Sequence, residues 1–250
     1  MKKYLLLLIE LILVLVIICQ GVSLVKKVYY SNMRYKNKEK IEKIMCNKSL
    51  KKSNIRYKNI PKSKLYDEYR MELKKLQQYS NKVVGIIIIP GTTIKYPVLQ
   101  GNNNEYYLNH DIDNNYNIFG EIFMDYRNSK KMEDDNIIIY GHNIKNRKDM
   151  FGELLKYKNR EFFEDNNIIL YITFNGVKEY KIFTSYVTDP YDNYRKISFE
   201  SLEEKNNYFK RIKERSIFKN DVNDYSNQVI TLSTCETDDS RMVVQGILIK

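Results

Sequence analysis

The chain has 250 residues, enough for one or two domains, and its 42 Lys and Arg against 31 Asp and Glu give a net charge of +11. Such an excess suits nucleic acid, anionic lipid or an anionic cell wall as a partner. Because the lysines are scattered among Asn, Tyr and Ile rather than gathered on one predicted helix face, we expect no nucleic-acid partner.

An apolar run covers residues 4–25 and is preceded by two lysines. It holds thirteen Leu, Ile and Val residues between positions 5 and 18. At roughly −0.3 to −0.6 kcal/mol each on the insertion scale, these outweigh the cost of about 2.5 to 3.5 kcal/mol for Glu10. The run is long enough to cross a bilayer, so we expect a membrane span over 4–25, with residues 1–3 as a cytoplasmic tip.

Two alternatives to an uncleaved anchor fit the same segment less well. A cleaved signal peptide needs small residues at its cleavage site, and the stretch Cys19–Ser23 provides a poor one. A lipoprotein with a lipidated Cys19 is disfavoured because the bulky Ile17 and Ile18 precede it. The positive charges on the two sides of the span are nearly balanced, so they do not orient it.

Helical patterns follow the span. Residues 26–60 are interpreted as a stalk or linker, in which the charged stretch Met33–Lys52 is a stalk or a first helix. Pro61 suits the first turn of a second helix, which the apolar spacing predicts through Gln78. We place the main folded domain at residues 61–250.

From residue 82 the apolar period changes to that of strands. Strands are predicted at 83–89, 94–99, 106–108, 121–125, 136–140, 168–174 and 177–187, with two more flanking Cys235. A short helix is predicted at 150–157 and an amphipathic helix at 198–215, capped by Ser198. Many short strands with few helices between them predict a mainly β domain, a mostly antiparallel barrel or sandwich.

The candidate nucleophile is Cys235, at the end of the strand-like stretch Thr231–Cys235. A single cysteine is more often a small buried hydrophobe, so this role requires partners. His142 and Arg241 each lie at the end of a predicted strand and can meet Cys235 at one end of a barrel. A histidine helps to form the thiolate or protonates a leaving amine, and an arginine holds an oxyanion. The other histidine, His110, is interpreted as a solvated loop residue.

Cofactor and disulfide chemistry find no support in the sequence. Cys19, Cys46 and Cys235 do not form a disulfide framework, because Cys19 lies in the span. No cluster of Cys, His and carboxylates has the spacing of a zinc site, and there is no phosphate loop or serine elbow. We therefore expect neither a metal nor a cofactor.

Taken together, these motifs resemble the sortases, cysteine transpeptidases of Gram-positive cell surfaces. The resemblance rests on Thr231–Cys235 followed by Arg241, with Tyr140-Gly141-His142 upstream. The blocks that are similar to class B are 96–101, 122–128, 192–194 and the helix at 198–215 before the cysteine strand. The chain differs from class B in one respect: only residues 236–240 separate the cysteine from the arginine, a shorter loop than that class has.

The resemblance implies a closed eight-stranded barrel with N-terminal helices and an inserted helix before the cysteine strand. It implies that Cys235 attacks the threonine carbonyl of a C-terminal sorting pentapeptide and forms a thioacyl enzyme. His142 would protonate the departing amine, and Arg241 would hold the substrate or the oxyanion. An amine of a peptidoglycan precursor would then resolve the intermediate.

The resemblance also implies a substrate groove, partners and a location. By matching positions, the groove would be lined by Asn104, Leu108, Tyr194, Ser233 and Glu236, although Leu108 and Tyr194 equally fit ordinary barrel packing. The partners would be secreted proteins with a C-terminal sorting motif, the peptidoglycan amine and the membrane. The chain would be a single-pass membrane protein, with its N-terminus inside and its catalytic domain outside the cell. Two alternatives stay open: a thiol endopeptidase that releases its product to water, and a non-catalytic surface protein.

Overall fold

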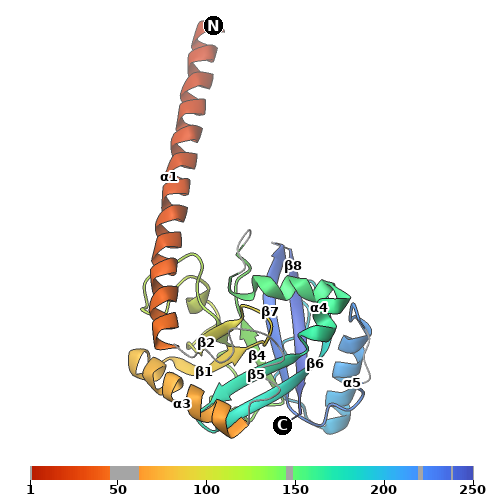
Figure 1. Cartoon of the computed structure of the whole chain (residues 1–250). Coiled ribbons are helices and arrows are strands. Elements are labelled where there is room, and N and C mark those ends of the chain that lie inside the picture. The colour runs from red at the N-terminus through yellow and green to blue at the C-terminus, as the bar shows by residue number, and fades with distance from the viewer. Residues whose placement is uncertain (1, 46–61, 145–148, 219–221, 238, 250) are drawn as a thin grey trace.

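Eight strands close into a β-barrel in the computed structural model, which describes residues 2–45, 62–144, 149–218, 222–237 and 239–249 (Figure 1). Around the barrel the order is β1-β2-β3-β4-β7-β8-β6-β5. The strands are β1 (Val83–Ile88), β2 (Lys95–Leu99), β3 (Phe123–Met124), β4 (Asn136–Tyr140), β5 (Ile168–Thr173), β6 (Gly176–Thr188), β7 (Val229–Thr237) and β8 (Ser240–Leu248). The closed eight-stranded barrel implied by the resemblance is confirmed.

The barrel is mixed, because two of its strand pairs are parallel: β2 with β3 and β4 with β7. The predicted strand at Tyr106–Leu108 is wrong, since these residues form a short 3₁₀ helix, η1. The side chain of Asn103 explains the difference: its Oδ1 accepts the N–H groups of Glu105 and Tyr106, at 3.0 and 2.9 Å, and so stabilises a turn in place of a strand.

Within the described ranges, four further helices pack around the barrel: α3 (Lys62–Tyr79), η2 (Phe151–Lys158), α4 (Arg160–Asp165) and α5 (Leu202–Glu214). The predicted cap of α5 is wrong, because Ser201 and not Ser198 caps it, accepting the N–H of Glu204 at 3.1 Å. The chain before α5 is held extended instead, since the Phe199 N–H donates to Asp135 at 3.1 Å.

The N-terminal helix α1 is a single 43-residue helix, Lys2–Ile44, that stands out from the barrel (Figure 1). The predicted span at 4–25 and the first part of the charged stretch from Met33 therefore belong to one element. The apolar half is exposed throughout and is long and apolar enough to cross a membrane. Further along, α1 packs on the barrel, where Arg34 and Ile41 are buried.

Both faces of much of the sheet are covered, which explains why strands such as β4 are continuous apolar runs. The barrel interior contains Ile137 and Ile139 of β4 packed with Ile230 and Leu232 of β7. Helix α3 covers the outside of β1 and β5 through Leu73 and its buried neighbours. The apolar packing of this layer makes the barrel a rigid support for the loops at its ends.

We predict that Leu73→Ala lowers the free energy of unfolding by about 2–5 kcal/mol, because it removes a fully buried side chain and leaves a cavity. Met71→Ala on the same helix, at a side chain 56% exposed, changes it by less than about 0.5 kcal/mol. Urea unfolding of the full chain in detergent micelles measures both values. A loss of unfolding free energy in Leu73→Ala no larger than that in Met71→Ala would show that the buried face of α3 does not stabilise the barrel.

Candidate active site

Strand register brings together the ends of β4, β7 and β8. Strands β4 and β7 are parallel, Tyr140 is the partner of Ser233, and the Gly141 N–H donates to the Ser233 carbonyl at 3.2 Å. His142 lies two residues beyond Tyr140, and Cys235 lies two residues beyond Ser233. The main chain of His142 therefore follows β4 beside the position of Cys235 in β7.

The hairpin between β7 and β8 adds the arginine. Cys235 and Arg241 are Cα partners across the antiparallel pair, and Thr237 pairs with Ser240. The strands on either side of the short connection noted in the sequence thus place the main chains of Cys235 and Arg241 directly opposite each other. The side chains of Cys235 and Glu236 lie outside the part of the chain that the structure describes.

A cleft of about 180 Å³ opens at this end of the barrel. Its lining includes His142 and Arg241, together with four of the five residues that the resemblance assigns to the groove: Asn104, Leu108, Tyr194 and Ser233. Further residues of the lining had no predicted role: Phe123, Tyr140, Gly141, Arg195 and Thr234. These come from β3, β4, β7 and the loop before α5, which converge here although they are far apart in the sequence.

His142 is held by its ring. Nε2 lies 2.7 Å from the Leu108 carbonyl oxygen, which can only accept, so Nε2–H donates and Nδ1 is the basic nitrogen of the neutral ring. Burial lowers the pKa of His142; the bond to Leu108 opposes this, and the positive charges of Arg34 and Arg241 add to the lowering. The described surroundings of the ring therefore favour its neutral form.

One wall of the cleft is a buried hydrogen bond between the Tyr194 hydroxyl and Ser233 Oγ, which lie 2.8 Å apart. Both residues are almost fully buried, so they shape the cleft rather than project into solvent. Leu108, by contrast, is 42% exposed and forms part of the rim. The cleft thus has a fixed polar wall at Tyr194 and an accessible apolar edge at Leu108.

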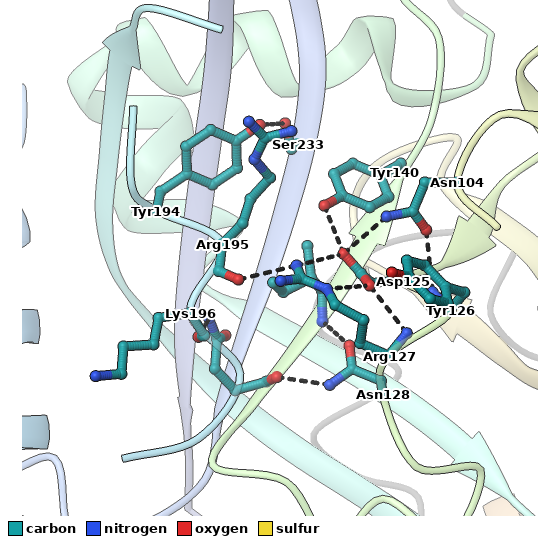
Figure 2. Close-up of polar contacts among 12 residues, drawn as sticks. Asn104, Asp125, Tyr126, Arg127, Asn128, Tyr140, Tyr194, Arg195, Lys196 and Ser233 are labelled. Carbon is teal, nitrogen blue, oxygen red and sulfur yellow. Dashed lines mark hydrogen bonds and ion pairs between the residues drawn. The ribbon is translucent and has the colours of Figure 1, made fainter. Parts of the chain in front are cut away.

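Asp125 joins the two walls of the cleft (Figure 2). Its fully buried carboxylate accepts hydrogen bonds from Asn104 Nδ2 at 3.0 Å, the Tyr140 hydroxyl at 2.9 Å and Arg127 Nη2 at 2.8 Å. Arg127 Nη2 also donates to the Arg195 carbonyl at 3.0 Å, beside Tyr194. Burial alone would raise the pKa of Asp125, but the hydrogen bonds from Arg127 and Tyr140 hold it below its ordinary value.

A second buried carboxylate, Asp149, connects helix α1 to the barrel. Arg34 Nε of α1 lies 3.0 Å from Asp149 Oδ2, and Arg34 Nη1 donates to the Gly120 carbonyl at 3.2 Å. Asp149 Oδ1 accepts from the Tyr96 hydroxyl at 2.8 Å and from Lys38 at 3.2 Å. The helix that carries the predicted span is thus bound to the barrel through a buried ion pair.

Asp149 and its partners Arg34 and Tyr96 lie at the end of the loop that begins at His142. The Tyr96 hydroxyl accepts the Met150 N–H at 2.9 Å, and the Phe151 N–H donates to the His142 carbonyl at 3.0 Å. Arg34 therefore acts on His142 in two ways, through its charge and by fixing the main chain to which the histidine is bonded.

Comparisons with known proteins match this chain to one family and one fold. A family model described as the Sortase domain matches residues 87–249. The chain is 36% identical over 187 residues to Sortase B of Listeria monocytogenes, covering 73% of this chain and 76% of that protein. It is 31% identical over 255 residues to Sortase B of Staphylococcus aureus, covering 100% of this chain and 98% of that protein. A solved Staphylococcus aureus sortase B–substrate complex matches with a TM-score of 0.68 and 34% identity, covering 72% of this chain and 86% of that one.

We predict that Arg34→Met lowers the free energy of unfolding by about 3–5 kcal/mol, because it leaves the buried Asp149 carboxylate without its main partner. Lys43→Met on the same helix breaks an exposed pair with Glu39 and changes it by less than about 1 kcal/mol. Chemical unfolding of the full chain in detergent measures both. A loss for Arg34→Met no larger than that for Lys43→Met would contradict a structural role for the buried pair.

We also predict that Arg241→Gln raises the pKa of His142, because the protonated ring then no longer faces the arginine charge. The titration is followed by NMR of the ring protons, with Cys235→Ala as the common background. Arg211→Gln on the exposed face of α5 serves as the control, for which no change in the His142 pKa is expected. An unchanged or lower pKa in Arg241→Gln would exclude the electrostatic coupling.

Proposed function

The chain belongs to the sortase family, within which it is a class B transpeptidase, and we propose that its cleft cleaves a C-terminal sorting pentapeptide after threonine. The observation that carries this proposal is the register that sets the main chains of His142, Cys235 and Arg241 side by side at the end of the barrel. Chemistry of this kind needs a thiol, a proton carrier and a fixed cation within one site.

In the proposed first step, the sulfur of Cys235 forms a bond to the threonine carbonyl carbon. His142, neutral because burial lowers its pKa, takes the thiol proton on its free ring nitrogen. The guanidinium of Arg241 stabilises the oxyanion, and as the C–N bond breaks His142 gives its proton to the departing amine. The product of this step is a thioester between Cys235 and the substrate.

In the second step, an amine of a peptidoglycan precursor attacks the thioester carbon. The C–S bond breaks, the amine loses a proton by way of His142, and the Cys235 thiol is restored. Atoms and charges balance without a metal or cofactor. We propose that Asn104, Leu108, Tyr194, Ser233 and Glu236 form the groove for the peptide, of which all but Glu236 line the described cleft.

We further propose that residues 4–25 of α1 anchor the chain in the cell membrane, with the N-terminus inside and the barrel outside. The length and hydropathy of this helix support the anchor. The orientation follows from the chemistry, because secreted proteins that carry a sorting motif and the amine of the cell wall are both found outside the membrane.

We predict that Cys235→Ala and His142→Ala each lose nearly all formation of an amide between a sorting-motif peptide and an added amine. His110→Ala keeps that activity, because its ring stacks on Tyr106 and does not line the cleft. The product is measured by mass spectrometry with and without the amine acceptor.

Each outcome of this experiment has a distinct meaning. Peptide cleavage without any amide product would favour the thiol endopeptidase, which releases its product to water. Unchanged amide formation in Cys235→Ala would show that the cysteine is not the nucleophile, whereas no turnover by the unsubstituted chain would favour the non-catalytic surface protein.

A further inference from the structure

Three tyrosines form a chain of edge-to-face ring contacts between α1 and the loop that precedes β3. The rings of Tyr29 and Tyr30 lie 5.4 Å apart and those of Tyr30 and Tyr116 lie 5.5 Å apart. Tyr29 is 62% exposed, Tyr116 is 50% exposed, and Ile118 in the same loop is 38% exposed. We call Tyr29, Tyr30, Tyr116 and Ile118 the interfacial patch.

The height of this patch follows from the helix geometry. Tyr30 is five residues beyond Val25, the last residue of the predicted span, which is about 7.5 Å along a continuous helix. The headgroup layer on each side of a bilayer is about 5–7.5 Å thick. Because Tyr116 contacts Tyr30, the patch lies at the depth of the headgroups when the span crosses the bilayer.

The chemistry of the patch suits that depth. Tyrosine is enriched at membrane–water interfaces, since its ring is apolar and its hydroxyl remains hydrated. Between the span and the patch lie Lys26 and Lys27, both exposed, which anionic lipid headgroups attract. The acidic Asp113 of the same loop is paired with Lys40, further from the span, and so does not oppose this attraction.

The same loop leads to the cleft. Tyr116 contacts the ring of His110, which stacks on Tyr106 at 4.1 Å, and the Leu108 carbonyl accepts the hydrogen bond of His142. In Figure 1 the β7–β8 hairpin lies at the end of the barrel toward which α1 projects, and the C-terminus lies at the opposite end. The cleft therefore opens at the end of the barrel that faces the span.

We propose that the interfacial patch is a second membrane contact, through which the catalytic end of the barrel rests on the phospholipid headgroups. The inference rests on the proposed anchor and extends it from one helix to the surface of the catalytic domain. The cleft then faces the bilayer at a fixed height, and substrates that are themselves held in the membrane reach it along the surface. In this arrangement the barrel does not rotate freely above the membrane surface.

The absence of tryptophan from the chain makes a direct test possible. Tyr116→Trp and Ile118→Trp each give the full-length protein one fluorophore in the patch. Ile249→Trp places it at the opposite end of the barrel, and Leu15→Trp places it inside the span. Each variant is reconstituted in phospholipid nanodiscs that carry a spin label on the headgroup or deep in the acyl chains.

The proposal expects the headgroup label to remove most of the emission of Tyr116→Trp and Ile118→Trp and little of that of Ile249→Trp. Leu15→Trp, quenched by the deep label, reports the anchor independently. Patch variants that behave like Ile249→Trp, with Leu15→Trp quenched, would overturn the second contact and leave the anchor standing. A Leu15→Trp variant that no lipid label quenches would overturn the anchor itself and, with it, this inference.

Discussion

The parallel pairing of β4 with β7 is the constraint on which the arrangement of this molecule depends. The two strands are 93 positions apart in the sequence, as in the pair Tyr140 and Ser233, and the same offset joins His142 to Cys235. A slip of one residue would turn every side chain of a strand to the other face and move the apolar residues out of the core. The packing of Ile137, Ile139, Ile230 and Leu232 therefore fixes the positions of the chemical groups, although none of these side chains lines the cleft.

Two buried carboxylates maintain the shape of the cleft around that register. Asp125 joins the segments that carry Asn104, Tyr140 and, through Arg127, Arg195; Asp149 joins Arg34 of α1 to the end of the loop that follows His142. Buried ion pairs contribute little net stability because of the cost of desolvation, but removal of one partner is strongly unfavourable. Loss of either partner of such a pair would therefore leave a buried carboxylate without compensation.

Local patterns in the sequence predicted the elements that local chemistry determines. Three isoleucines at 137–139 give this run an apolar, β-branched centre on both faces, and the strand at 136–140 was predicted with the observed bounds. The strand at Tyr106–Leu108 was wrong because a side chain three residues earlier satisfies the main chain in a turn. The meeting of Cys235, His142 and Arg241 at the barrel end was expected from strand ends. The roles of Asp125 and Arg34 were not predicted, since their partners lie as far as 21 and 115 positions away and leave no local signal.

The continuity of α1 from Lys2 to Ile44 has a mechanical consequence. A flexible linker would let the barrel sample many positions relative to the apolar half of the helix. Because the helix is continuous, the barrel and the apolar half instead rotate and tilt together as one unit. With the proposed anchor in a bilayer, encounters with partners held in the same membrane would be set by two-dimensional diffusion, and a partner's scissile bond would have to be presented at one height. An insertion of four residues in the exposed part of the helix would shift that elevation by about 6 Å and turn the cleft by about 40°. Under the proposed anchor, the length and phase of this helix therefore set the height and the direction at which the cleft meets a partner.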